Sequence, residues 1–318
     1  MRTLTLCPAR QTTLSQITRI LMKLILNTGP ESCSHLLTRH LRAACISIGV
    51  LCSALLPAGT IAQLPTDAMI AELPYAQAVI DASGYHGTML IHDLNRGRYY
   101  ASDKNSVAQQ HIPASTFKIL SSLVALQTGL VANAESVLPW DGVTRGRTET
   151  NADLTLRDAF RLSSVPHYQA LVRAVGESGM QRALSDAAYG NQNINGGIDQ
   201  FWLTGDLRIS PLQQIDVLRR LYHNALPFSI SAQNTVKEIM SIEVTDEYVL
   251  RAKTGLAVLD GDKNTGWWIG WVEHDNNVTL FATVLTATAP DSGFIPARLS
   301  ITRDVLRELG VLPGVGHQ

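Results

Sequence analysis

The segment Pro113–Lys118 constrains this chain more than any other, because it places a serine and a lysine three residues apart at the start of an apolar helix. Gly129 supplies a signal for the end of that helix. Ser115 should therefore lie in the first turn of a buried helix, with Lys118 one turn further along the same face. The apolar residues that recur at roughly helical spacing are Phe117, Ile119, Leu120, Leu123, Val124, Leu126 and Leu130.

This spacing can support nucleophilic catalysis. A serine hydroxyl is a weak nucleophile until a base within hydrogen-bonding reach accepts its proton. Lysine can be that base only where burial or neighbouring groups keep its amine neutral, or where the amine is chemically altered. A serine and a lysine three apart nevertheless occur about once by chance in a chain of this length. Taken alone, the pair favours an ordinary helix start with a solvated lysine, so the interpretation depends on the motifs that accompany it.

The composition limits the classes of protein to which the chain can belong. Its 318 residues, 45% of them hydrophobic and 17% charged, suffice for one large domain or two closely packed ones. The formal net charge is −1 and no long basic run occurs, which argues against nucleic acid as a partner. The nine histidines form no HxxxH or HExxH pair, so we expect no metal site.

The first 62 residues differ from the rest of the chain. Glu31 is their one acidic residue, against six basic ones. Arg39–Arg42 precedes the apolar run Ala43–Leu56, and small residues follow in Pro57–Ala62. This order is typical of a secretory signal peptide, here with an unusually long leader before it. The alternative is an uncleaved membrane anchor, which the short and interrupted apolar run disfavours.

Removal of this leader on export would leave residues 63–318 as the mature chain. We expect that chain to be periplasmic and to have no stable association with the membrane. It would contain no cysteine, so its stability would depend on its core and not on disulfides. The four cysteines all lie in the leader: Cys7, Cys33, Cys45 and Cys52.

The hydrophobic periodicity of the mature chain changes along its length and predicts a mixed α+β fold. Period-two patterns near both ends predict strands, and helical patterns fill the middle. We therefore expect one antiparallel sheet built from the two chain ends, flanked by helices, with a helical region from the middle beside it. The predicted helices are Thr66–Ile80, Leu154–Leu184, Pro211–His223 and Pro296–Leu309, and the predicted strands are Thr88–Asp93, Arg98–Ala101, Tyr248–Leu256, Gly266–Glu273 and Val278–Thr288.

Further short motifs follow the Ser115 helix in order. They are Ser163–Val165 in the helical middle, Tyr189–Asn191 at the start of a loop rich in Asn and Gly, Lys253–Gly255 on a strand, and Trp267–Trp271 on the next strand. Each is weak alone. Ser163 could simply cap a helix that begins near Pro166, and Tyr-Gly-Asn can be an ordinary turn. Tryptophans more often belong to a core than to a site.

The order Ser-x-x-Lys, Ser-x-Val, Tyr-Gly-Asn, Lys-Thr-Gly resembles the penicillin-recognising serine enzymes, and most closely the class D (oxacillinase-type) β-lactamases. The resemblance runs from about Tyr85 to Leu309. Class A enzymes place Ser-x-Asn or Ser-Asp-Asn where this chain has Ser163–Val165. Phe201–Leu203 and the following Leu207–Pro211 are also similar to class D segments. The resemblance implies a β-lactamase/transpeptidase-like fold for residues 63–318.

The resemblance also implies catalytic roles. Ser115 would attack the β-lactam and form an acyl-enzyme. Lys118 would carry a carboxyl group from carbon dioxide (N6-carboxylysine) and act as general base in both half-reactions. Ser163 would relay a proton toward the leaving nitrogen. The indole N–H of Trp202, which can only donate, would hold the carboxylated lysine. Apart from carbon dioxide or bicarbonate, no cofactor is expected.

The same resemblance assigns residues to the substrate. Lys253, Thr254 and Arg298 would bind the carboxylate of the β-lactam. The backbone N–H groups of Ser115 and Leu256 would form the oxyanion hole. The full set expected to bind or line the substrate is Val165, Tyr189, Lys253, Thr254, Gly255, Leu256 and Arg298.

One residue, His167, departs from the family pattern, and three functions remain open. His167 is not expected in class D enzymes and is interpreted as a residue of the helix surface or the pocket rim, with a catalytic role as the minority interpretation. The main hypothesis is a β-lactamase that acts on a small-molecule β-lactam and confers resistance, as a monomer or a homodimer. The alternatives are a penicillin-binding sensor that acylates but barely deacylates, and a cell-wall transpeptidase.

Overall fold

A computed structural model of the chain describes residue 65 and residues 69–258 and 264–314. These residues belong to one compact unit that begins at Leu64. The predicted signal peptide and its cysteines lie outside the described residues. No helix among the described residues is long and apolar enough to cross a membrane.

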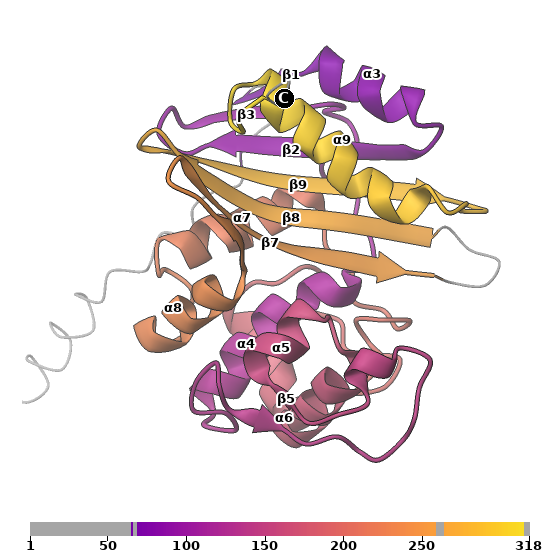
Figure 1. Cartoon of the computed structure of the whole chain (residues 1–318), viewed down its shortest axis with the longest axis vertical. Coiled ribbons are helices and arrows are strands. Elements are labelled where there is room, and N and C mark those ends of the chain that lie inside the picture. Colours follow the sequence, from indigo (N-terminus) through magenta and orange to yellow (C-terminus); the bar gives the residue numbers. More distant parts are fainter. Residues whose placement is uncertain (1–64, 66–68, 259–263, 315–318) are drawn as a thin grey trace, which may run out of the picture. The chain divides into compact units, whose positions relative to one another are not determined.

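A seven-stranded sheet forms the centre of this unit, and its strands come from both ends of the unit (Figure 1). The strands are β1 (Ile70–Glu72), β2 (His86–Asp93), β3 (Arg98–Ala101), β6 (Ser241–Val244), β7 (Tyr248–Ala257), β8 (Asn264–His274) and β9 (Asn277–Ala287). Their order is β1-β3-β2-β9-β8-β7-β6, and all neighbours are antiparallel except β1 and β3. β2 pairs with β9 along its whole length, so the two ends of the unit meet inside the sheet.

Helices cover both faces of the sheet. The helices of the described residues are α3 (Pro74–Ala82), α4 (Lys118–Gln127), α5 (Leu156–Arg161), α6 (Val165–Asp186), α7 (Pro211–Tyr222), α8 (Ile230–Ile239) and α9 (Phe294–Glu308), and α3, α7 and α9 lie on the sheet. One apolar cluster joins α3 and α9 to Met89 and Ile91 of β2, and another joins α7 to Leu90 between them. Because neighbouring strand residues point to opposite faces, these two clusters lie on opposite sides of the sheet. The expected α+β architecture is therefore confirmed.

The remaining helices form the helical region from the middle of the chain (Figure 1). It contains α4, α5, α6 and α8, the 3-10 turns η2 (Ala114–Phe117) and η3 (Thr148–Thr150), and a small sheet of β4 (Val137–Leu138) and β5 (Leu154–Thr155). α4 is almost entirely buried and packs against α6 and α8. The segment that carries Ser115 and Lys118 therefore lies at the boundary between this region and the sheet.

Two predicted helices are wrong in part, and proline accounts for both errors. The segment predicted as a helix from Thr66 contains strand β1, and α3 begins only at Pro74. The helix predicted from Leu154 begins with β5 and is divided into α5 and α6, with Pro166 in the first turn of α6. Proline lacks a backbone N–H and is favoured in the first turn of a helix. Both prolines therefore start helices and do not interrupt them.

Contacts between η2 and β7 position the segment that contains Ser115. A Cβ atom added at Gly255 would lie 2.8 Å from the carbonyl oxygen of Pro113, so only glycine permits this close approach. The indole of Trp267 on β8 donates to the carbonyl of Ile112 at 2.9 Å. The Lys-Thr-Gly and tryptophan motifs thus hold the chain that leads into Ser115 against the sheet.

Candidate active site

Ser115 and Lys118 meet at the junction of η2 and α4. The Ser115 Oγ lies 2.9 Å from the Lys118 Nζ, which is hydrogen-bonding distance. The residue before the serine, Ala114, has a φ of 48°, an uncommon value for a residue with a side chain. Strained backbone of this kind persists where surrounding structure enforces it, and it often marks functional sites.

Lys118 is fully buried, and its surroundings favour the neutral amine. Burial lowers the pKa of Lys118 well below its usual value, and the charges of Lys253 and Arg147 lower it further. The ring centre of Tyr168 lies 5.1 Å from the Nζ. No carboxylate among the described residues forms an ion pair with this lysine. These surroundings therefore favour a neutral amine next to the serine hydroxyl.

Trp202 contributes a buried donor to the same region. Its ring centre lies 5.4 Å from that of Phe117, the residue before Lys118. The Nε1 atom of Trp202 is buried and has no hydrogen-bonding partner among the described residues. A buried N–H without an acceptor is costly, so the site is suited to an acceptor group that the amino-acid chain alone does not provide.

Ser163 lies in a tight turn between α5 and α6. Its φ is 55°, and its Oγ accepts a hydrogen bond from the Lys253 Nζ at 3.0 Å. Val165, which is half-buried, begins α6 two residues later. The Ser-x-Val motif is thus joined to the Lys-Thr-Gly motif by a direct contact between their side chains.

The strand that carries Lys253–Gly255 has a free edge at the site. β6 pairs with β7 only as far as Arg251, and η2 packs against β7 beyond that point. Ala252 donates its N–H away from β8, to Met240. N–H groups along a strand alternate in direction, so the N–H of Leu256 points to the same edge. This geometry agrees with the expected oxyanion hole between Ser115 and Leu256.

Arg298 of α9 adds a second unpaired cation next to Lys253. It is 6% exposed, and its Nε and Nη1 have no hydrogen-bonding partner among the described residues. Burial lowers the pKa of Arg298 to about 10. Burial and the charge of Arg298 together lower the pKa of Lys253 to about 7. A buried guanidinium without a carboxylate is unfavourable, so this part of the site is suited to an anionic ligand.

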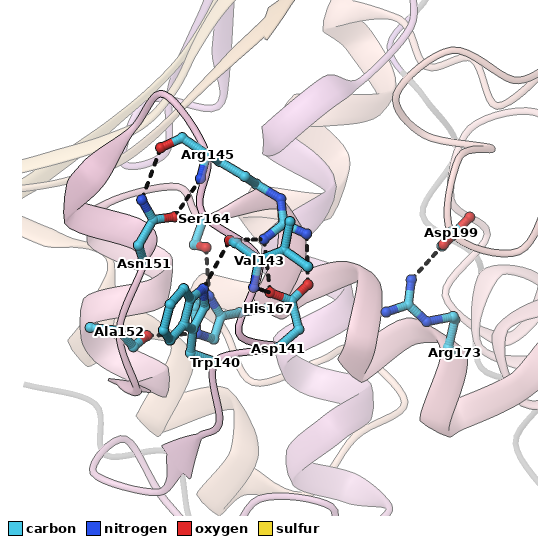
Figure 2. Close-up of polar contacts among 10 residues, drawn as sticks. All are labelled: Trp140, Asp141, Val143, Arg145, Asn151, Ala152, Ser164, His167, Arg173 and Asp199. Atoms are coloured by element: carbon cyan, nitrogen blue, oxygen red, sulfur yellow. Dashed lines mark hydrogen bonds and ion pairs between the residues drawn. The ribbon is translucent and has the colours of Figure 1, made fainter.

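Two predicted positions are buried in the structure. Tyr189 is wholly buried and packs edge-to-face on Phe117 at 5.6 Å, and its assignment to the substrate stays a prediction. The interpretation of His167 as a surface or rim residue is wrong, because the side chain is 2% exposed and contacts Ser164 (Figure 2). A lone polar residue in a helical pattern gives no sign that tertiary contacts bury it.

Some residues at the site had no signal in the sequence. Arg147 lies in an irregular loop, yet its charge acts on both Lys118 and Lys253. Tyr168 follows His167 in α6, and its hydroxyl lies 2.7 Å from that of Ser122 beneath the lysine. Their positions depend on the tertiary fold and not on local spacing. No group of three or more potential metal ligands occurs among the described residues.

Comparisons with known proteins agree with this geometry. The model of the penicillin-binding protein transpeptidase domain matches residues 83–307. Beta-lactamase OXA-48 of Klebsiella pneumoniae is 40% identical over 227 residues, which are 71% of this chain and 84% of that protein. The crystal structure of the class D β-lactamase YbXI from Nostoc has a TM-score of 0.71 at 40% identity, and covers 74% of this chain and 99% of that one.

A regulatory protein is also similar. BlaR1 of Bacillus licheniformis is 32% identical over 231 residues, which are 73% of this chain but 38% of that protein. The fold and the serine–lysine site define a penicillin-recognising serine enzyme. The chain belongs to the class D β-lactamases.

Proposed function

We propose that this class D enzyme opens the β-lactam ring through an acyl-enzyme on Ser115. The observation that carries the proposal is the 2.9 Å separation between the Ser115 Oγ and the Nζ of a fully buried lysine. In the acylation step the Oγ would bond to the lactam carbonyl carbon, the C–N bond would break, and the nitrogen would gain a proton. Water would then hydrolyse the ester and release the ring-opened acid.

Lys118 is proposed to carry a carboxyl group derived from carbon dioxide. Only a neutral amine reacts with carbon dioxide, and burial of Lys118 favours the neutral form. The buried Trp202 Nε1 lacks an acceptor among the described residues, which supports its assignment as the donor to this group. The carboxylated lysine would supply an anionic general base within reach of Ser115, so both half-reactions could use the same base.

The other polar groups are proposed to move a proton and to stabilise charge. Ser163 would deliver a proton to the leaving nitrogen, which is supported by the hydrogen bond that its Oγ accepts from the Lys253 Nζ. The N–H groups of Ser115 and Leu256 would stabilise the oxyanion of the tetrahedral intermediate. Lys253, Thr254 and Arg298 would bind the substrate carboxylate, which is supported by the unpaired guanidinium of Arg298.

Turnover of a chromogenic cephalosporin tests the proposal. Wild type should hydrolyse many equivalents, and Ser115→Ala should lose several orders of magnitude of kcat. Ser121→Ala is a matched control, because that buried hydroxyl bonds only to the carbonyl of Phe117 within its own helix and should be dispensable. A wild type that releases one equivalent of product and then stops would favour the sensor alternative, for which the similarity to BlaR1 is the supporting observation.

We also propose that residues 1–62 direct export and are removed, so that the mature enzyme meets its substrate in the periplasm and confers resistance. The charge asymmetry and apolar run of this segment support the proposal. Mass spectrometry of protein from a periplasmic extract should find an N-terminus near residue 63. Full-length protein retained in the membrane fraction would contradict it.

A further inference from the structure

The buried His167 contacts Ser164, the residue that follows Ser163 in the chain (Figure 2). The Nδ1 of His167 is 2.7 Å from the Oγ of Ser164, and its Nε2 is 3.1 Å from the carbonyl oxygen of Ala152. Both side chains are almost completely buried, with Ser164 0% and His167 2% exposed. The mechanism proposed above gives no role to this pair.

The two contacts determine where the imidazole carries its proton. A carbonyl oxygen can only accept, so the Nε2 of His167 must donate to Ala152. In the neutral ring Nδ1 is then bare and accepts from the hydroxyl of Ser164. Ser164 precedes α6 as its N-cap residue but forms no capping bond to the helix backbone. Its hydroxyl is used instead to hold the histidine ring in place.

The carbonyl of Ala152 belongs to a loop that is closed by its own hydrogen bonds (Figure 2). The backbone N–H of Trp140 donates to Asp153 at 2.8 Å. The side chain of Asn151 accepts from the N–H of Arg145 at 3.0 Å and donates to its carbonyl at 2.9 Å. Residues 140–153 therefore form a closed loop that can act as a stiff support.

This loop is attached to the Ser163 turn on both sides of the serine. Arg147 donates from Nη2 to the carbonyl of Leu162 at 2.8 Å, before Ser163. His167 connects the loop to Ser164, after it. Ser163 itself has the uncommon φ of 55°, which is maintained only when neighbouring contacts enforce it. The contacts of Arg147 and His167 on either side of Ser163 are suited to maintain this φ.

We propose that His167 is a positioning residue, whose neutral ring fastens the 140–153 loop to the Ser163 turn and so holds the Ser163 hydroxyl in place for proton transfer. The proposal rests on the role of Ser163 in the proposed function. His167 does not touch the substrate and acts through the turn. Loss of the ring should therefore slow acylation, in which Ser163 delivers the proton, more than it slows hydrolysis of the ester.

Protonation of the His167 ring should weaken its contact with Ser164. A proton on Nδ1 would force the Ser164 hydroxyl to become an acceptor and leave its own hydrogen without a partner in a buried place. Burial lowers the pKa of His167 below its usual value, so the ring is neutral at pH 7. The charged groups that act on the ring are Asp141 and Asp153, which favour protonation, and Arg145, which opposes it.

Three substitutions separate positioning from simple structural damage. His167→Val removes both contacts and should lower the acylation rate on the order of 10- to 100-fold, as expected for a misplaced catalytic group. His167→Gln has an amide that can still donate to Ala152 and should recover most of the rate. His92→Gln is the matched control: that buried histidine lies on β2 and stacks on Tyr99, remote from the loop, so turnover should not change.

A double-mutant cycle with Ser163→Ala gives the decisive measurement. Single-turnover acylation is followed with the chromogenic cephalosporin in bicarbonate-saturated buffer, from pH 5 to 8. If His167 acts through Ser163, His167→Val should change the rate little once Ser163 is alanine. Wild type should lose acylation on the acid side with an ionisation that His167→Gln lacks. Additive losses in the cycle, or an unchanged rate in both His167 variants, would overturn the proposal. Failure of the serine mechanism itself would appear separately, as full turnover by Ser115→Ala.

Discussion

At the scale of single residues, the site consists of polar groups whose natural partners are absent from the polypeptide. Lys118 is buried beside a hydroxyl. Among the described residues, the Trp202 N–H has no acceptor, and the Nε and Nη1 of Arg298 have no hydrogen-bonding partner. Each arrangement disfavours the folded chain by itself, because buried polar groups cost free energy when they are unpaired. Together they support the two proposed anionic groups, a carboxyl group on the lysine and a substrate carboxylate at the arginine.

The anionic group at the lysine can be tested through Trp202. Trp202→Phe keeps an aromatic ring but removes the N–H donor, so carboxylation of Lys118 should weaken. Turnover in degassed buffer should fall about tenfold or more and should recover with added bicarbonate, since a charge-assisted hydrogen bond contributes about 1.5–3 kcal/mol. Carbon-13 NMR with labelled bicarbonate measures the carboxylated lysine directly. Trp271→Phe is the control, because that indole donates to Glu273 on the sheet. A Trp202 variant with unchanged bicarbonate dependence would contradict the assignment.

The anionic group at the arginine can be tested through Arg298. Arg298→Ala removes the unpaired guanidinium, so KM for penicillins should rise by about 10- to 100-fold while kcat falls less, as expected for lost uniform binding. Arg303→Ala, on the same helix, breaks an ion pair with Glu243 and should leave KM unchanged. Steady-state kinetics with several penicillins provide the measurement. An Arg298 variant with wild-type KM would show that Lys253 and Thr254 hold the carboxylate without it.

At the scale of elements, the site depends on how closely η2 approaches β7. Within the part of the chain that the structure describes, no strand pairs with the β6-side edge of β7 beyond Arg251, and Gly255 lets the backbone of Pro113 come close to this edge. Helix α4 then carries Lys118 away from the strand and into the helical core. The distance between the strand and the turn would therefore set the geometry of the proposed oxyanion hole.

A methyl group at Gly255 should change this distance. In Gly255→Ala the new Cβ would lie 2.8 Å from the carbonyl oxygen of Pro113, so the turn must shift away from the strand. We expect kcat to fall about 10²-fold or more, because oxyanion-hole donors contribute about this much. Gly314→Ala, where nothing lies within 4 Å, serves as the control. Crystallography of the variant and kcat for the cephalosporin measure the effect, and full activity would contradict it.

The sequence predicted regular elements better than the contacts between them. Strands β7, β8 and β9 follow period-two patterns, and the hairpin at Asp275 and Asn276 uses residues that tolerate the positive φ observed there. The short strand β6 and helix α8 were missed, because brief apolar runs fit either period. The family could be predicted from the order of the short motifs along the chain. The burial of His167 and Tyr189, and the place of Arg147, follow from tertiary packing that no local pattern records.

At the scale of the whole molecule, acid should affect activity and folding through different groups. His92 is buried on β2, stacks on Tyr99 at 3.8 Å, and its Nδ1 has no hydrogen-bonding partner among the described residues. Burial, with the charges of Arg219 and His223, lowers the pKa of His92 to about 4. In the unfolded chain the pKa is near the ordinary value of about 6.5. The unfolded state therefore binds a proton that the folded state does not, and stability falls as the pH drops from about 6.5 toward 4.

The difference between the folded and unfolded pKa values of His92 predicts how much acid lowers the stability. Between pH 7 and pH 5, His92 should lower the free energy of unfolding by about 2 kcal/mol. His92→Gln does not titrate in this range and should lack that part of the decrease. Urea denaturation of both proteins at the two pH values measures the difference. If both lose the same free energy, His92 is not responsible. Activity that fails at a higher pH than folding would point instead to groups at the site, either the proposed carboxylated lysine or His167.

The pairing of β2 with β9 determines when the sheet can form during synthesis of the chain. A ribosome completes β2 and β3 early, but the strand that pairs with the other side of β2 is among the last segments to be synthesised. A two-stranded hairpin is marginally stable by itself, and pairing between distant segments is slow because a long loop must close. The nascent chain therefore lacks a completed sheet until β9 has been made. That delay would suit the export proposed above, in which the polypeptide is threaded unfolded through a translocation channel. It should also leave any product that terminates early without a completed sheet and open to proteolysis.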